Sequence, residues 1–169
     1  MRKFAPIAVA LMLFNLAGSA MAASSPADNM FGSLYGKWRG KGVIILQVGK
    51  PEEKLSCRVT YTPVSDTLVD ANIRCAAVDF KIDAKGKISY SKHSKMFRGN
   101  LSDKETGWTL VLSAGQPKKQ YIRFGLKIAK AEVNGWLDLK IKSRKSHTWL
   151  ALRTTSTGLK TLLRIDFRR

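Results

Sequence analysis

The sequence predicts an all-β protein, a small antiparallel up-and-down barrel, with a β-sandwich as the alternative. From Tyr35 onward, apolar and polar residues alternate with period two, whereas a helix would give a period near 3.6. Turn-forming residues interrupt this alternation at regular intervals, which indicates nine to eleven short strands and no helix in the mature chain. A closed barrel is favoured because closure removes exposed strand edges.

Residues 1–22 have the pattern of a cleaved secretory signal peptide. Arg2 and Lys3 precede an apolar run over residues 4–16, and an Ala-x-Ala exit follows at residues 20–22. The apolar run is too short to span a bilayer, which takes about 20 residues. We therefore expect cleavage before Ala23 and a periplasmic or secreted protein.

Residues 23–33, with the sequence ASSPADNMFGS, are mostly small or polar and predict a flexible N-terminal lead-in. Cleavage at residue 22 leaves 147 of the 169 residues, which is the size of one ordinary domain. We expect residues 34–169 to form a single antiparallel β-barrel domain.

The first predicted strand carries four residues that we take as a fold signature, Gly36, Trp38, Gly40 and Gly42. Glycines at such spacing permit sharp coiling of the strand and close approach of a neighbouring backbone. In the next strands the apolar positions alternate with polar ones, and they are Leu55, Cys57, Val59 and Tyr61, then Val69, Ala71, Ile73 and Cys75.

The alternation continues to the C-terminal end of the sequence. A turn is expected at residues 83–86, a strand end at residues 102–104 and another at residues 115–117. The apolar positions of these later strands are Val78, Phe80, Ile82, Ile88, Tyr90, Phe97, Leu101, Trp108, Leu110, Leu112, Ile122, Phe124, Leu126, Ile128, Val133, Leu137, Leu139 and Ile141. The final strands are expected within residues 148–154 and 159–167.

Cys57 and Cys75 are the only cysteines, and both fall on the apolar face of neighbouring predicted strands. An even count in an exported protein favours one disulfide. There is no Cys-x-x-Cys, and both histidines are far from the cysteines in the sequence, so no metal site or cofactor is predicted.

The Gly-x-Trp of the first strand resembles the signature of the calycin superfamily, the lipocalin-type barrels. The resemblance implies that Trp38 packs under an arginine from a late strand, for which Arg153 and Arg164 are the candidates. The wider pattern of the front half resembles small exported alphaproteobacterial proteins of unassigned function. It rests on Trp38-x-Gly40-x-Gly42, Cys57-Arg58-x-x-Tyr61 and Ile73-Arg74-Cys75-Ala76.

A weaker resemblance links the chain to periplasmic metalloprotease inhibitors of the calycin type, through the early tryptophan and two cysteines about twenty residues apart. Such inhibitors act through an N-terminal trunk, which would correspond to residues 23–25 here. This resemblance implies protease inhibition as an alternative function.

The chain is strongly basic, with a formal net charge of +18 that becomes +16 once Arg2 and Lys3 are removed. A charge of this size attracts polyanions. In the cytosol the expected partner would be nucleic acid, but export argues against that. We expect anionic lipid or lipopolysaccharide as the partner.

A basic strand face is the candidate anion-binding patch. Lys140, Lys142 and Arg144 lie at alternate positions and so share one face of a strand. Trp136 falls on the same face, where an aromatic ring among cations suits head groups or sugars. The remaining predicted members come from the preceding hairpin and are Lys118, Lys119, Arg123, Lys127 and Lys130.

No arrangement in the sequence predicts catalysis. His93 and His147 sit in polar segments without a neighbouring acid and nucleophile, so both are interpreted as surface-loop histidines. The expected function is non-enzymatic binding of an anionic or amphiphilic envelope component through the basic patch. The alternatives are a calycin-type protease inhibitor, a small outer-membrane barrel, and a barrel that holds a small apolar ligand inside.

Overall fold

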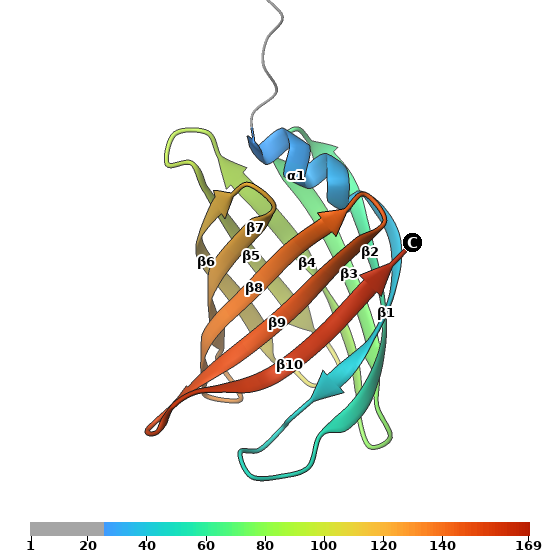
Figure 1. Ribbon diagram of the computed structural model, residues 1–169, viewed down its shortest axis with the longest axis vertical. Coiled ribbons are helices and arrows are strands. Elements are labelled where there is room, and N and C mark those ends of the chain that lie inside the picture. The colour runs from blue at the N-terminus through green and yellow to red at the C-terminus, as the bar shows by residue number, and fades with distance from the viewer. Residues whose placement is uncertain (1–25) are drawn as a thin grey trace, which may run out of the picture.

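The computed structural model describes residues 26–169, so the predicted signal peptide and the first residues of the predicted lead-in lie outside the described residues. One helix precedes ten strands (Figure 1). In chain order, the described elements are α1 (Pro26–Leu34), β1 (Gly36–Ile44), β2 (Glu53–Ser65), β3 (Leu68–Ala76), β4 (Lys81–Ser91), β5 (Met96–Asp103), β6 (Thr109–Lys118), β7 (Tyr121–Ile128), β8 (Val133–Ser143), β9 (Ser146–Thr155) and β10 (Gly158–Arg168).

The strands form a closed up-and-down barrel, which decides between the barrel and the sandwich. Each strand pairs antiparallel with the next one in the chain, and β10 returns to pair with β1. This seam runs from the pair Arg39 and Arg168 to the pair Ile44 and Leu163. Two sequence-based boundaries were wrong: residues 83–86 lie inside β4, and residues 115–117 lie inside β6, which continues through a register shift.

The period-two alternation places the apolar side chains inside the barrel. In β2, Leu55, Cys57, Val59 and Tyr61 are buried, while the residues between them face outward. The aromatic side chains of Phe97, Phe124 and Phe167 are also buried. The interior of the described barrel is therefore a packed apolar core.

Glycines of the predicted fold signature make the seam possible. A Cβ on Gly42 would lie 1.9 Å from the carbonyl oxygen of Arg164, and a Cβ on Gly40 would lie 2.6 Å from side-chain carbons of Ile165 and Phe167. Side chains at these positions would push β1 away from β10. Gly86 plays the same part between β4 and β5, which is why it does not form the predicted turn.

The expected flexible lead-in without a helix was wrong for residues 26–33, because this segment belongs to α1. Met30, Phe31 and Leu34 lie on one side of the helix and are buried against the barrel. The ring of Phe31 meets the ring of Phe97 edge to face at 5.0 Å. α1 thus covers one end of the barrel (Figure 1). Its nine residues give too short a periodic pattern to stand out among small and polar neighbours.

Trp38 fixes the covered end. Its indole N–H donates a hydrogen bond of 2.6 Å to the carbonyl oxygen of Leu34, at the end of α1. The guanidinium of Arg169 lies over the indole ring at 4.4 Å and also bonds the carbonyl oxygen of Tyr35. The expectation that Arg153 or Arg164 would supply this arginine was wrong, since Arg153 lies near the opposite end and Arg164 faces outward.

The predicted disulfide is confirmed. Cys57 and Cys75 are direct partners in the pairing of β2 with β3, and their sulfurs are bonded. Both side chains are buried in the core. The two cysteines are 18 residues apart in the chain, and their bond joins two strands that already pair.

We expect the double substitution Cys57→Ala and Cys75→Ala to lower the free energy of unfolding by about 3 kcal/mol, because the unfolded chain regains loop entropy. Urea denaturation monitored by circular dichroism measures this loss. The wild type in reductant is the matched control and should lose a similar amount. Equal stability of the variant and the oxidised wild type would contradict a stabilising role.

Candidate functional site

The two ends of the barrel differ in character. α1 and Trp38 close the end where β1 begins, whereas five connecting segments project from the opposite end, at residues 45–52, 77–80, 104–108, 129–132 and 156–157. We call this the open end. Four exposed apolar side chains lie on or beside these segments, namely Leu46, Val48, Val78 and Leu159, with Val78 91% exposed.

A hollow of about 520 Å³ lies at the open end, between the β1–β2 loop and the β9–β10 hairpin. It forms because β10 extends beyond its last pair with β1 and continues with β9 alone (Figure 1). Val43, Ile45, Val48 and Leu150 contribute apolar lining. The cations of the lining are Lys50, Arg153, Lys160 and Arg164, accompanied by the single acid Glu52.

Arg153 crosses from β9 to the β1–β2 loop at this hollow. Its Nη2 donates to the carbonyl oxygens of Leu46 at 2.8 Å and Ile45 at 3.4 Å. Its Nε is buried and has no hydrogen-bond partner among the described residues. Arg153 thus ties the β1–β2 loop to β9 and adds its positive charge to the lining of the hollow.

The structure divides the predicted basic patch into parts. Lys118 and Lys119 on the β6–β7 hairpin and Lys140, Lys142 and Arg144 at the end of β8 all lie near the covered end, and all are exposed. The other members of the predicted patch lie toward the opposite end of the barrel or form contacts within the protein. As a group, the nine residues do not form one surface.

Lys127 and Lys130 lie at the far end of the β7–β8 pair, where Lys130 Nζ donates to the carbonyl oxygen of Thr106. Arg123 is held by two hydrogen bonds to Asp138, at 2.7 and 2.8 Å. This ion pair and the hydroxyl of Tyr121 outweigh the burial of Asp138, so the pKa of its carboxyl lies below the ordinary value. The guanidinium of Arg123 is thus already paired with a carboxylate of the same chain.

Trp136 faces outward between β7 and β9, as the alternation predicts, and is 42% exposed. It lies two residues from Asp138 and four from Lys140 on the same face of β8. The indole and Lys140 therefore belong to one face, but the residue between them is Asp138, which pairs with Arg123 on β7.

The interpretation of His147 as a surface-loop residue was wrong, whereas His93 does lie exposed in the β4–β5 turn. His147 is the second residue of β9 and is 1% exposed. Its ring stacks on Phe167 at 4.7 Å and meets the edge of Trp38 at 4.4 Å. The alternation His147, Trp149, Ala151 was the signal in the sequence that it points inward.

Both ring nitrogens of His147 lack a hydrogen-bond partner in the described part of the chain. Burial, followed by the positive charge of Arg169, lowers the pKa of His147 to about 3. The imidazole is therefore neutral at neutral pH and belongs to the aromatic core. No group of three or more His, Cys, Asp or Glu side chains is placed to hold a metal ion within residues 26–169.

The fold places the protein in a class: it is a closed, ten-strand antiparallel up-and-down barrel of the calycin-like type. Among solved structures it is similar to Rv2717c from M. tuberculosis, with a TM-score of 0.65, 14% identity, and coverage of 87% of this chain and 99% of that one. These values show a shared fold.

Two further structures are similar at lower scores. The S-type phycobiliprotein lyase CPES from Guillardia theta has a TM-score of 0.51 and 9% identity, covering 84% of this chain and 91% of its own. A barrel named EF1p2_mFAP2b, bound to DFHBI, has a TM-score of 0.50 and 10% identity, covering 85% and 98%. No protein-family model and no curated protein sequence matches the chain. The resemblances to exported alphaproteobacterial proteins and to metalloprotease inhibitors stay predictions.

In the described part of the chain, no helix is long and apolar enough to cross a membrane.

The buried His147 predicts a specific dependence of stability on pH. Its folded-state pKa of about 3 lies below the ordinary value of 6.5, so between these values the unfolded chain binds the additional proton. The contribution of the neutral His147 to the free energy of unfolding is therefore fully present above about pH 6.5. It is lost as the pH decreases, by up to about 1.4 kcal/mol per pH unit.

Urea denaturation of the wild type and of His147→Phe at pH values between about 5 and 7 measures this contribution. The phenylalanine variant keeps the aromatic packing and should have a flatter pH profile. Parallel profiles for the two proteins would show that His147 is accessible to protons in the folded state.

Proposed function

We propose that this protein is a non-enzymatic, exported barrel that binds an anionic amphiphile of the cell envelope, such as an anionic lipid or lipopolysaccharide, at the hollow of the open end. The observation that carries the proposal is the composition of that hollow, in which apolar side chains and cations line the same space. A ligand with an acyl chain and a phosphate or carboxylate matches both features. The volume of the hollow, about 520 Å³, lies in the range of small-molecule sites.

The position of Arg153 supports an anionic head group. Its guanidinium bridges β9 and the β1–β2 loop and so holds a fixed positive charge in the lining of the hollow. Lys50 and Lys160 belong to the same lining from the two projecting segments. An anion bound there would contact cations from both sides of the hollow, and charge-assisted hydrogen bonds are the strong ones.

The outer surface of the barrel favours this function over that of an outer-membrane barrel. A membrane barrel has an apolar band facing outward and a polar interior. Here the outward positions of β2 include Lys54, Ser56 and Arg58, while Leu55 and Val59 are buried. The arrangement is the reverse of the one that lipid requires.

Export is supported by the disulfide between Cys57 and Cys75, since disulfides persist in oxidising compartments. The predicted signal peptide, which lies outside the described residues, stays the main argument for a periplasmic or secreted protein. In that location anionic lipid and lipopolysaccharide are the abundant anions.

Within the predicted basic patch, the cations near the covered end are exposed and are proposed to assist long-range attraction of an anionic surface. They lack the adjoining hollow and apolar wall of the open end. For this reason we assign the ligand to the hollow and a steering role to the patch.

A small apolar ligand inside the barrel is the second proposal, suggested by the barrel EF1p2_mFAP2b, which is bound to DFHBI. In this chain Phe97, Phe124 and Ile165 are at most 1% exposed and fill the interior, so an internal ligand would have to displace them. Protease inhibition would depend on residues 23–25, which lie outside the described part of the chain. The hollow therefore has the stronger support.

Binding of a lysolipid tests the proposed function. We expect lysophosphatidylglycerol to bind the mature protein more tightly than the zwitterionic lysophosphatidylcholine, by isothermal titration below the micelle concentration. The double variant Lys50→Gln and Lys160→Gln removes two cations from the hollow and should weaken binding of the anionic ligand about thirtyfold, at about 1 kcal/mol for each cation.

Arg98→Gln with Lys92→Gln is the matched control, because it removes the same charge from exposed positions on β5 and the β4–β5 turn. It should change affinity less than twofold (about 0.4 kcal/mol). Equal affinity of the wild type for the two lysolipids, or equal losses in the two double variants, would contradict a site at the hollow.

A further inference from the structure

Four arginines form a continuous row on the outside of the barrel, across four neighbouring strands. Arg39 on β1 is the direct partner of Arg168 on β10 and of Arg58 on β2. Arg58 is in turn the direct partner of Arg74 on β3. All four side chains are exposed. We call these four residues the arginine row; with adjacent strands about 4.8 Å apart, it spans about 14 Å of the sheet.

Most of this row has no compensating acid. Arg74, at one end, pairs with Asp83 on β4 at 3.2 Å. Arg39, Arg58 and Arg168 form no ion pair with any residue of the described chain. Like charges at directly opposite positions of a sheet are destabilising, so the fold gains nothing from this arrangement. A row that costs stability is typical of a site kept for binding.

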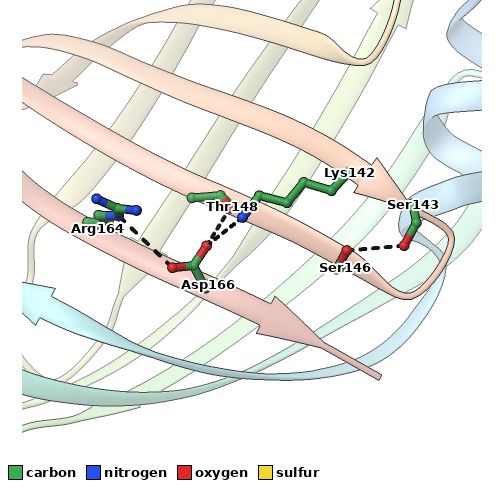
Figure 2. Close-up of polar contacts among 6 residues, drawn as sticks. All are labelled: Lys142, Ser143, Ser146, Thr148, Arg164 and Asp166. Atoms are coloured by element: carbon green, nitrogen blue, oxygen red, sulfur yellow. Dashed lines mark hydrogen bonds and ion pairs between the residues drawn. The ribbon is translucent and has the colours of Figure 1, made fainter.

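A second carboxylate beside the row, Asp166 on β10, binds groups outside the row. Figure 2 shows its oxygens directed at side chains of β8, β9 and β10. One oxygen accepts hydrogen bonds from Thr148 at 2.6 Å and Lys142 at 3.0 Å, and the other lies 4.0 Å from Arg164. These groups, led by the Thr148 hydroxyl, hold the pKa of Asp166 below its ordinary value. Asp166 is therefore ionised, and its ion pairs are with Lys142 and Arg164 and not with the row.

The row also borders a hollow. A space of about 560 Å³ lies on the outer face of β10, β1 and β2. Its charged lining includes Arg39, Arg58 and Arg168, with Asp166 as the single acid. Lys41, two residues along β1 on the same face, adds a fourth cation to the lining. Three guanidinium groups around one space suit several anionic oxygens at once, because each guanidinium binds a phosphate through two parallel N–H donors.

We propose that the arginine row is a second binding site, specific for a group that carries two or more linked or neighbouring phosphates. A single phosphate would engage only part of the row, whereas an oligophosphate spans adjacent strands. Linear or paired phosphates occur both in soluble oligophosphates and in diphosphate head groups of lipids. The shared chemistry is the multiple phosphate.

This site is separate from the hollow at the open end, with which its lining shares no residue. It needs no acyl chain, and the proposed function does not depend on it. Tripolyphosphate has no acyl chain, and for cardiolipin the two sites are distinguished by whether the row variant or the hollow variant loses binding.

Binding of tripolyphosphate to the mature protein, measured by isothermal titration, tests the second site. We expect tripolyphosphate to bind at least about tenfold more tightly than inorganic phosphate, because it reaches more than one guanidinium. Arg39→Gln with Arg58→Gln keeps most of each side-chain stem and should weaken tripolyphosphate about tenfold or more. Phosphatidylcholine vesicles containing cardiolipin, a lipid with two phosphates, form a second arm that identifies a membrane source.

Two controls separate binding from structure. Arg98→Gln with Lys92→Gln removes the same charge on the far side of the barrel and should leave both probes nearly unaffected. The melting temperature of Arg39→Gln with Arg58→Gln should equal or exceed that of the wild type, because a repulsion has been removed. Loss of either probe in the row variant alone supports the proposal. Unchanged binding of both probes, equal losses in the two double variants, or a lowered melting temperature with intact binding would overturn it.

Discussion

Closure of the sheet between β1 and β10 is the constraint on which the rest of the structure depends. A ten-strand sheet with an open seam would expose two edges and the apolar face behind them. Here the seam is made by Gly40 and Gly42, whose missing side chains let β1 lie against Ile165 and the backbone of Arg164. Arg169, just beyond β10, then reaches across Trp38 to the segment that joins α1 to β1.

The closed seam has consequences for where function can lie. The interior is occupied by buried aromatic and aliphatic side chains, and α1 with Trp38 covers one end. Polar chemistry is therefore confined to the open end and the outer face. Even His147, the one buried histidine of the described chain, is held neutral among aromatic rings by its lowered pKa.

The sequence predicts local features of this protein well, because they follow from alternation along one strand. The strand class and the inward positions of β2 are of this kind. The pairing of Cys57 with Cys75 followed because they are the only two cysteines and both lie on apolar strand faces. Features that depend on the register between strands were not predicted. Arg39, Arg58 and Arg168 are far apart in the chain and meet only through the pairs of β1 with its two neighbours.

The register between strands also accounts for the other differences from the sequence-based expectations. Arg169 replaces Arg153 and Arg164 over Trp38 because the end of β10, and not its middle, lies beside the start of β1. Lys127 and Lys130 separate from the predicted patch because β7 carries them to the opposite end of the barrel. α1 is recognisable only from its burial against Phe97, which no local pattern reveals.

The most direct test of this account is amide hydrogen exchange, resolved by residue, at the seam. If the barrel is closed, the paired amides of residues 39–44 and 163–168 exchange as slowly as those of the central pair of β2 and β3. The tip of the β9–β10 hairpin, which has no partner in β1, exchanges faster. Rapid exchange along both sides of the seam, as in two free edge strands, would contradict closure and the placement of both proposed sites.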